Sequence, residues 1–269
     1  MKILDKDKMG ILYFDFSKRD NYQNTFVMHC HNAYELIYFV SGNAIFNIEG
    51  NKHILTPNDL LITKPKQYHS IDIFSDFPYI RFDILIDESS LFGKFLDELN
   101  IKDNVINCAN SKIIQQNFNN IANYIQQGNH SEDFYDLFIS NLIEILINLK
   151  YINKKQKSNL NQNVSSLTKA AIDYINNNLY KIKNVDEIAN ELHISRNYLF
   201  RLFSSDLNLS PQKYIRTKRL LCAQSLIKSG KNPSEIYEAV GFNNYVSFYK
   251  MYVSFFGYSP KEEKANRNK

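Results

Sequence analysis

Residues 186–203 read Asp-Glu-Ile-Ala-Asn-Glu-Leu-His-Ile-Ser-Arg-Asn-Tyr-Leu-Phe-Arg-Leu-Phe, and their spacing is that of a helix-turn-helix. Ala189 stands where two crossing helices leave room only for a small side chain, and Ile194 fills the turn between them. Leu199 and Leu202 hold the second helix against the first. The stretch therefore predicts a pair of short helices joined by a tight turn.

This packing leaves one face of the second helix free, and Ser195 precedes that helix as a cap. The outward side chains are those of Arg196, Asn197, Phe200 and Arg201. In a helix-turn-helix this face enters the major groove of DNA. Arginine reads guanine and asparagine reads adenine through paired hydrogen bonds, whereas a phenyl ring packs on a thymine methyl group or a sugar. These four residues are therefore candidates for DNA contacts.

The design is repeated further along the chain. Residues 236–252 read Ile-Tyr-Glu-Ala-Val-Gly-Phe-Asn-Asn-Tyr-Val-Ser-Phe-Tyr-Lys-Met-Tyr, with Gly241 at the turn and with Phe248 and Met251 facing inward. Between the two units, Pro211 to Ile227 is expected to form a connecting helix. Its basic residues are Lys213, Arg216, Lys218 and Arg219. One helix-turn-helix match also fits a generic three-helix packing unit, but two in tandem favour DNA binding.

Charge is divided unevenly along the 269 residues, whose net charge is +4. Residues 1–163 contain 16 Lys and Arg against 19 Asp and Glu, a net charge of −3, and residues 164–269 contain 16 against 9, a net charge of +7. Basic faces also occur without a nucleic-acid partner. A basic half joined to a mildly acidic half nevertheless indicates a nucleic-acid-binding module attached to a part with another role.

Five segments of the basic half stand in a pattern known from one family: Ala171–Ile175, Tyr198–Phe203, Arg219–Ala223, Val240–Phe242 and Phe256–Pro260. Through them, residues 168–260 resemble the DNA-binding domain of AraC/XylS-type transcription regulators. The resemblance implies two helix-turn-helix units that are joined by a long helix and read adjacent major-groove segments on one face of DNA. It places the base contacts at Arg196, Asn197, Phe200 and Arg201 in the first unit and at Asn244, Tyr245, Ser247 and Lys250 in the second.

The sequence departs from the family pattern at positions that are usually basic or small. Tyr237 replaces a small residue, Lys250 replaces Arg, and Ser204-Ser205 and Val253-Ser254 replace basic pairs. Each lost cation lowers the salt dependence of log affinity by a slope of about one. We therefore expect weaker intrinsic DNA affinity and a greater dependence on dimerisation or on neighbouring proteins.

Ahead of the basic half, three regions differ in composition and in hydrophobic periodicity. Residues 153–166 are polar, lack aromatic residues and show no periodicity, which is typical of a linker. Between Ile11 and Ile86, short runs rich in Ile, Phe, Tyr and Val alternate with turn residues and predict a β-barrel or sandwich. Residues 111–127 and 134–152 have helical spacing, and the second stretch carries a broad apolar stripe. That helix either packs on its own barrel or joins two subunits.

After the linker the pattern is helical to near the end of the chain. The expected helices are Leu167–Leu179, Val185–Leu192, Arg196–Leu207, Pro211–Ile227, Pro233–Val240 and Asn244–Phe256. Ser210 and Asn232 each precede a proline, which is the usual order of an N-cap residue and the first helical residue. These starts fix two of the boundaries.

His29, His31, Glu35 and Gly42 reproduce the first motif of the cupin barrel, and His69 follows where the second motif places its histidine. Because alternate residues of a strand share a face, His29 and His31 point the same way. In metal-binding cupins the three histidines and the glutamate hold iron, manganese, nickel or zinc. Imidazole and carboxylate groups are suitable ligands for such metals.

Two other interpretations of this motif stay open. The second motif has lost its glycines and proline, with Asn58, Lys64 and Lys66 in their places. Sensor barrels of regulators similar to this chain often keep the histidines as polar lining. We favour a pocket for a small polar ligand, without a metal or cofactor, lined by His29, His31, Glu35, His69, Tyr38 and Arg81. The third interpretation is a buried polar network with no ligand.

Other chemistry has little support. Cys30, Cys108 and Cys222 are odd in number and far apart, so neither a disulfide framework nor a cysteine zinc cluster is encoded and a reducing compartment is expected. No glycine-rich phosphate loop or catalytic set is recognisable, and we predict no enzyme activity. The charged N-terminus lacks the apolar core of a signal peptide, and no run reaches ~18 apolar residues, so a cytoplasmic protein without membrane association is expected.

These patterns predict an α+β chain of two domains. Residues 1–152 are expected to form a cupin-like ligand-sensing and dimerisation domain, with its barrel over about 11–100 and helices over about 111–152; residues 153–166 are the linker and 167–269 the all-α DNA-binding domain. The predicted function is a ligand-responsive transcription activator. Its expected partners are double-stranded DNA, a small-molecule effector such as a sugar, RNA polymerase and a second copy of the chain. The alternatives are a metal-dependent cupin enzyme with an attached DNA-binding domain and a regulator that needs no small molecule.

Overall fold

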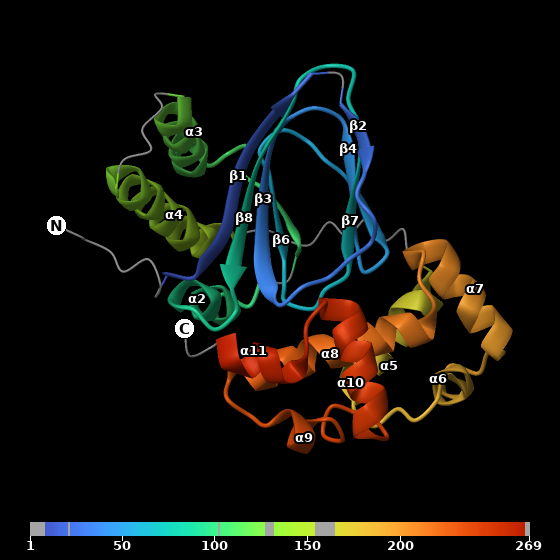
Figure 1. The fold of residues 1–269 in the computed structure, drawn as a ribbon. Coiled ribbons are helices and arrows are strands. Elements are labelled where there is room, and N and C mark those ends of the chain that lie inside the picture. The colour runs from blue at the N-terminus through green and yellow to red at the C-terminus, as the bar shows by residue number, and fades with distance from the viewer. Residues whose placement is uncertain (1–8, 21, 102, 127–131, 154–164, 267–269) are drawn as a thin grey trace. The chain divides into compact units, whose positions relative to one another are not determined.

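The computed structural model describes residues 9–20, 22–101, 103–126, 132–153 and 165–266. The chain divides into two compact units, residues 1–161 and 162–269. The described strands lie in the first unit together with helices α2 to α4, and the second unit consists of helices α5 to α11 (Figure 1). Most of the predicted linker, residues 154–164, lies outside the described residues.

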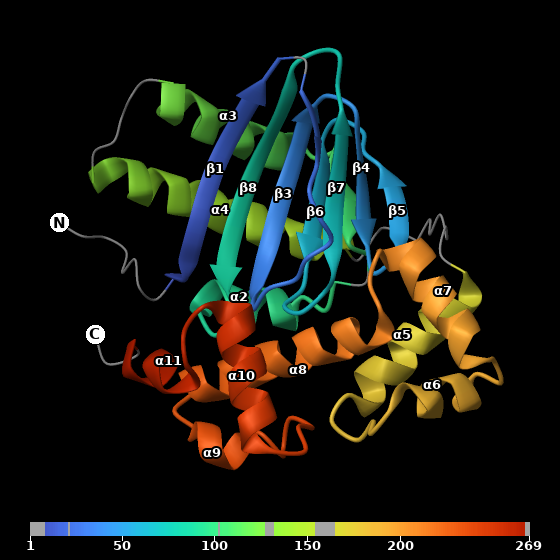
Figure 2. The same cartoon turned by 45° about the vertical axis from the view of Figure 1, so that its right-hand side comes forward.

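Two antiparallel sheets build the first unit and face each other (Figure 2). The larger sheet has the order β1 (Ile11–Arg19), β8 (Tyr79–Asp87), β3 (Ala33–Ser41), β6 (Asp59–Thr63) and β9 (Val105–Asn107). The smaller sheet has the order β2 (Gln23–Thr25), β7 (His69–Phe74), β4 (Ala44–Ile48) and β5 (Asn51–Ile54). The prediction of a barrel or sandwich made of short strands is confirmed.

Strand β3 is buried on both faces because it separates two hydrophobic cores. Its residues Ile37 and Phe39 point between the sheets and pack in one cluster with Phe46 of β4. Leu36 and Tyr38 point the opposite way, into a cluster that includes the helices of this unit. The alternation of a strand thus distributes one nearly continuous apolar run, Ala33 to Val40, between the two cores.

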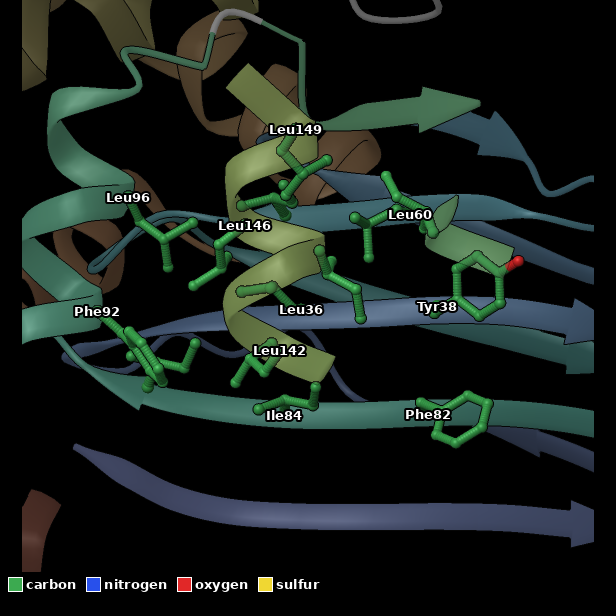
Figure 3. Packing of buried hydrophobic residues seen from close by; sticks show 14 of the residues in the cluster. Leu36, Tyr38, Leu60, Phe82, Ile84, Phe92, Leu96, Leu142, Leu146 and Leu149 are labelled. Atoms are coloured by element: carbon green, nitrogen blue, oxygen red, sulfur yellow. The ribbon is translucent and has the colours of Figure 1, made fainter. Parts of the chain in front are cut away.

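Three helices cover the outer face of the larger sheet: α2 (Leu91–Glu98), α3 (Lys112–Gln126) and α4 (Glu132–Asn153). Figure 3 shows Leu142, Leu146 and Leu149 of α4 pointing toward apolar side chains of the sheet. Of the two interpretations of this apolar helix, packing on its own sheet is therefore the one that the structure contains. Ile147 and Tyr151 of α4 remain exposed.

Two non-glycine residues take the left-handed conformation at positions where the cupin pattern has lost residues. Asn58 has a φ of 72° and Lys66 a φ of 67°. Asparagine visits this region more readily than most residues. The backbone nitrogen of Lys66 donates to the oxygen of His31 at 2.7 Å, and its Nζ lies 2.9 Å from the carboxylate of Glu88. These contacts hold the loop that leads to His69 without the missing glycine.

The second unit contains α5 (Ser166–Asn178), α6 (Val185–Glu191), α7 (Arg196–Leu207), α8 (Pro211–Lys228), α9 (Pro233–Ile236), α10 (Tyr245–Phe256) and α11 (Pro260–Asn266). The predicted helix over Pro233–Val240 is too long, since α9 ends at Ile236 and the chain continues in turns. Those turns end at Gly241, whose φ of 88° cannot continue a right-handed helix. None of the described helices is long and apolar enough to cross a membrane.

The four basic residues of α8 divide between two environments. Lys213 and Arg216 are exposed. Lys218 is buried, and its Nζ donates to the side-chain oxygen of Asn176 at 2.8 Å. Arg219 is also turned inward, toward the backbone of Gly241. Only half of this basic set therefore contributes to the surface of the second unit.

The Arg219 guanidinium of α8 binds the backbone of two other segments. It donates to the oxygen of Leu179 at 2.9 and 2.7 Å and to that of Ile182 at 2.5 Å, both in the segment before α6. It also donates to the oxygen of Gly241 at 2.7 Å, in the turn of the second helix-turn-helix. One side chain thereby ties the first helix-turn-helix unit to the second.

Gly241→Ala is expected to destabilise the second unit by about 2 kcal/mol or more. A Cβ atom at Gly241 would lie 2.7 Å from Cζ of Arg219, which its hydrogen bonds hold in place, and φ would remain positive. Gly257→Ala is the matched control, because its φ of 81° carries the same strain while its Cβ would meet nothing within 4 Å. Urea unfolding followed by circular dichroism measures both. Equal losses in the two variants would contradict the clash.

Candidate ligand site and nucleic-acid interface

Three histidines of the first unit converge. His29, His31 and His69 each bring one ring nitrogen within 4.8 Å of the others. The backbones of His29 and His69 pair as an isolated bridge, with N···O distances of 3.0 and 2.9 Å. His69 is buried, His31 is half-buried and His29 is exposed. The sequence-based expectation that these residues meet agrees with this arrangement.

Glu35 of β3 completes the cluster, since its position on the strand matches the inward-pointing Ile37. Its Oε2 lies 2.9 Å from Nε2 of His69 and 3.6 Å from Nε2 of His31. Burial raises the pKa of Glu35, but the two imidazoles outweigh burial and hold this pKa well below its usual range. Burial lowers the pKa of His69, whereas Glu35 more than reverses that effect and the pKa is raised. The cluster therefore favours a carboxylate paired with positive charge.

Arg81 and Asp83 extend the polar cluster along β8. Nη2 of Arg81 lies 3.1 Å from Oδ2 of Asp83, and both side chains are largely buried. Burial and the charge of Glu35 raise the pKa of Asp83 to about 7. The sequence analysis included Arg81 but missed Asp83. The signal that could have found it is the alternation of Tyr79, Arg81 and Asp83 with apolar residues along one strand.

The prediction that Tyr38 lines this site is wrong. Its ring stacks on Phe118 of α3 with centroids 3.9 Å apart, and its hydroxyl donates to Oδ1 of Asn58 at 2.8 Å. Tyr38 follows the inward-pointing Ile37, and neighbouring residues of a strand point to opposite faces. Tyr38 therefore belongs to the core beneath the helices (Figure 3).

Helix α7 presents the candidate DNA-contacting residues of the first helix-turn-helix. Arg196, Asn197 and Arg201 are exposed, and Phe200 is half-buried. Nη1 of Arg196 lies 3.1 Å from Oδ2 of Asp186, and its guanidinium carbon lies 5.6 Å from the centre of the Phe200 ring. The exposed ion pair contributes little to stability, but it holds Arg196 near the outer face of the helix.

Helix α10 presents the corresponding residues of the second helix-turn-helix. Asn244 is its N-cap, and Oδ1 of Asn244 accepts a hydrogen bond from the backbone nitrogen of Ser247 at 2.8 Å. Reading of adenine through that oxygen would therefore compete with the cap. The half-buried ring of Tyr245 lies 5.9 Å from that of Phe248 and shares in the core. Lys250 is exposed.

A groove of about 410 Å³ brings the two helix-turn-helix units to one surface. Its polar lining includes Arg196, Gln212, Arg216, Asn244 and Ser247. A neighbouring groove of about 350 Å³ adds Lys213 and Lys250 around the shared Arg216. Gln212 was missed by the sequence analysis, and Arg216 was noted only as part of the connecting helix. Arg216 is exposed and Gln212 is half-buried. Their place in the groove could not be derived from α8 alone, because Lys218 and Arg219 on the same helix are turned inward.

Two known domain families match the chain. Residues 12–133 match the family described as the AraC-like ligand binding domain, and residues 188–266 match the family described as the helix-turn-helix domain. This chain belongs to the AraC family of transcription regulators. The barrel with the histidine cluster lies within the match to the ligand-binding domain, and the helix-turn-helix units that line the groove lie largely within the match to the helix-turn-helix domain.

AraC-family relatives of the chain are bacterial regulators. The uncharacterized HTH-type transcriptional regulator YfiF of Bacillus subtilis is 26% identical over 89% of this chain and 79% of its own length. The lactose operon transcription activator of Staphylococcus xylosus is 25% identical over 82% and 80%. The Msm operon regulatory protein of Streptococcus mutans is 37% identical, but over only 29% of this chain and 28% of its own length. The crystal structure of ToxT from Vibrio cholerae O395 is 17% identical over 96% of this chain and 97% of its own, with a TM-score of 0.39.

Proposed function

We propose that this AraC-family regulator is a ligand-responsive activator that binds two adjacent major-groove segments of DNA. The observation that carries the proposal is the groove in which Arg196 of the first helix-turn-helix and Asn244 of the second line one surface beside the basic Arg216. Two recognition helices on one surface suit successive turns of one face of a duplex. A DNA-binding role would place the chain in the cytoplasm with RNA polymerase as a further partner.

The proposed effector site is the polar cluster of the first unit. Arg81 and Glu35 offer opposite charges there, and His29, His31 and His69 offer ring nitrogens. A ligand rich in hydrogen-bonding groups suits such a site. A sugar is the organic effector class that we propose to test first, because the relative from Staphylococcus xylosus is named for a lactose operon.

Strand β3 offers a short route from the effector site to the helices. Glu35 lies on its inner face, while Tyr38 on its outer face stacks on α3. An effector that binds one arrangement of this strand more tightly would shift the population of that arrangement. We propose that α3 and α4 carry the change to a second copy of the chain through exposed residues such as Ile147 and Tyr151.

Fluorescence anisotropy of the full chain against DNA fragments that flank its own gene tests the proposal. Arg201→Ala and Lys250→Ala are each expected to weaken competitor-resistant binding by about tenfold or more, because one good base contact contributes about 1–3 kcal/mol. Lys231→Ala removes an exposed lysine that lines neither groove and should leave the affinity unchanged. A salt series on the unaltered protein tests the expected shallow salt dependence.

Two outcomes would count against the DNA-binding model. Binding that nonspecific competitor DNA removes equally from every fragment would contradict sequence-specific recognition. Equal losses in the Lys231→Ala and Lys250→Ala variants would contradict the assignment of α10 as a recognition helix. If a saturating sugar changed neither DNA affinity nor dimerisation, the sugar as effector would be rejected while DNA binding stood.

A further inference from the structure

The two recognition helices have the same length and the same kind of cap, so their residues can be matched one to one. Both α7 and α10 span 12 residues, and each follows an N-cap side chain that accepts from the backbone nitrogen three residues later. In each helix the fourth residue is fully buried. Counted from the caps, Asn197 corresponds to Val246, and Arg201 corresponds to Lys250. The second helix therefore presents an apolar side chain where the first presents an amide.

Val246 lies on the outer face of α10, with 62% of its surface exposed. Phe248 of the core follows two residues later, which is roughly 200° around the helix, so Val246 points away from that core. Lys250 follows Val246 by four residues and is exposed on the same face. The valine thus stands beside the lysine that is assigned to DNA.

The place of Val246 in the helix brings it within reach of bases. A single exposed valine is common on a protein surface. Val246, however, is the second residue of α10, and the N-terminal residues of a recognition helix are the ones that contact base edges in the major groove. The corresponding residue of α7, Asn197, is a candidate base contact for the same reason.

Two of the four side chains assigned to DNA in this unit are already engaged in the fold. Oδ1 of Asn244 accepts the cap hydrogen bond at 2.8 Å, and the ring of Tyr245 lies 5.9 Å from that of Phe248. Of the assigned set, Ser247 and Lys250 are left to hydrogen-bond with DNA. The second unit therefore offers fewer polar groups for base recognition than the sequence suggests.

The chemistry of valine selects one feature of the major groove. The methyl group of thymine is the apolar group that base pairs present there. Against the polar edge of another base, valine would displace water without replacing its hydrogen bonds, which is unfavourable. Its branched side chain is stiff, so little freedom is lost when it contacts a methyl group.

We propose that Val246 contacts the methyl group of a thymine in the second major-groove segment. The second segment is then recognised in part by apolar contact, whereas the first is recognised mainly through hydrogen bonds from residues such as Asn197 and Arg201. This inference rests on the proposed function, since it names what one recognition helix contacts on DNA. It adds Val246 to the residues assigned to DNA in this unit and makes thymine the preferred base opposite it.

Replacement of single thymines by deoxyuridine tests the contact, because the two bases differ only in the methyl group. The full chain is titrated by fluorescence anisotropy, with competitor DNA, against the fragment that it binds specifically, and each thymine is replaced in turn. Replacement of the thymine opposite α10 is expected to weaken binding about fourfold, the value for one buried methyl group.

Val246→Ala is expected to weaken binding to the thymine duplex by about fourfold and to reduce the cost of deoxyuridine at that position to less than about 1.5-fold, because protein and base share one contact. Alanine favours a helix more than valine does, so this variant should fold. Val27→Ala is the matched control, the same change at a valine of the first unit that is 79% exposed, and should alter neither value. Phe200→Ala identifies thymines contacted by the first unit, whose deoxyuridine cost Val246→Ala should retain.

Two results would overturn the assignment. One is a full deoxyuridine cost at every sensitive thymine in the Val246→Ala variant, as in Val27→Ala. The other is a fragment in which no replacement costs the unaltered protein more than about 1.5-fold. Specific binding of the thymine duplex would in both cases leave the proposed function intact. Nonspecific binding of that duplex would contradict the proposed function itself, and the thymine contact with it.

Discussion

Arg219→Met is expected to lower the free energy of unfolding of the helical unit by about 3 kcal/mol, because hydrogen bonds from a charged donor contribute about 1.5–3 kcal/mol each. The guanidinium donates to the backbone oxygens of Leu179, Ile182 and Gly241, and methionine fills the space without a donor. Hydrogen exchange followed by mass spectrometry measures the loss in peptides of this unit, because it resolves opening free energies segment by segment.

Arg216→Met is the matched control on the same helix. Arg216 is exposed and lines the groove, so its loss should leave stability within about 0.5 kcal/mol while DNA affinity falls. In the Arg219→Met background, Gly241→Ala should cost less than it does alone, since the atom that its Cβ would meet is gone. Unchanged exchange in the Arg219→Met variant would contradict the role of this side chain as the tie between the two helix-turn-helix units.

The helical half was the more predictable part of the chain because its signals are local. Ser195 and Ser210 cap α7 and α8 by accepting hydrogen bonds from backbone nitrogens three residues later. Ala189 and Leu199 are both buried, as the close helix crossing requires. Such patterns depend on residues within a few turns of one another. The predicted length of α9 was wrong because the end of this helix is not set by local residues alone. It depends on Gly241 and on the distant Arg219.

The candidate ligand site was only partly predictable, because strand β3 is apolar on both faces. Its sequence does not tell which set of alternate residues faces the smaller sheet and which faces the helices. Tyr38 was assigned to the wrong set, and Asp83 was missed because its partner Arg81 and its neighbour Glu35 meet it only through strand pairing. The prediction that the histidines and Glu35 lie together was not affected by this ambiguity, because the motif itself fixes which residues share a face.

Phe118→Ala is expected to destabilise the first unit by about 4 kcal/mol, the range found when a buried phenylalanine is truncated. Phe118 of α3 is almost fully buried. Its ring lies 3.9 Å from that of Tyr38 and 5.0 Å from that of Phe82, so truncation leaves a cavity between the helix and the larger sheet. Hydrogen exchange in peptides of α3, β3 and β8 measures this loss.

Ile113→Ala provides the control for this variant, since Ile113 lies on the same helix with 47% of its surface exposed and should cost well under 1 kcal/mol. The outcome bears on signalling as well as on stability. Tyr38 and Glu35 occupy opposite faces of β3, so loosening α3 should weaken any effect of a sugar on DNA affinity while leaving effector-free DNA affinity close to that of the unaltered protein. A Phe118→Ala variant that opens no more readily than Ile113→Ala would contradict this packing, and one that is destabilised yet responds fully would move the signalling route away from β3 and α3.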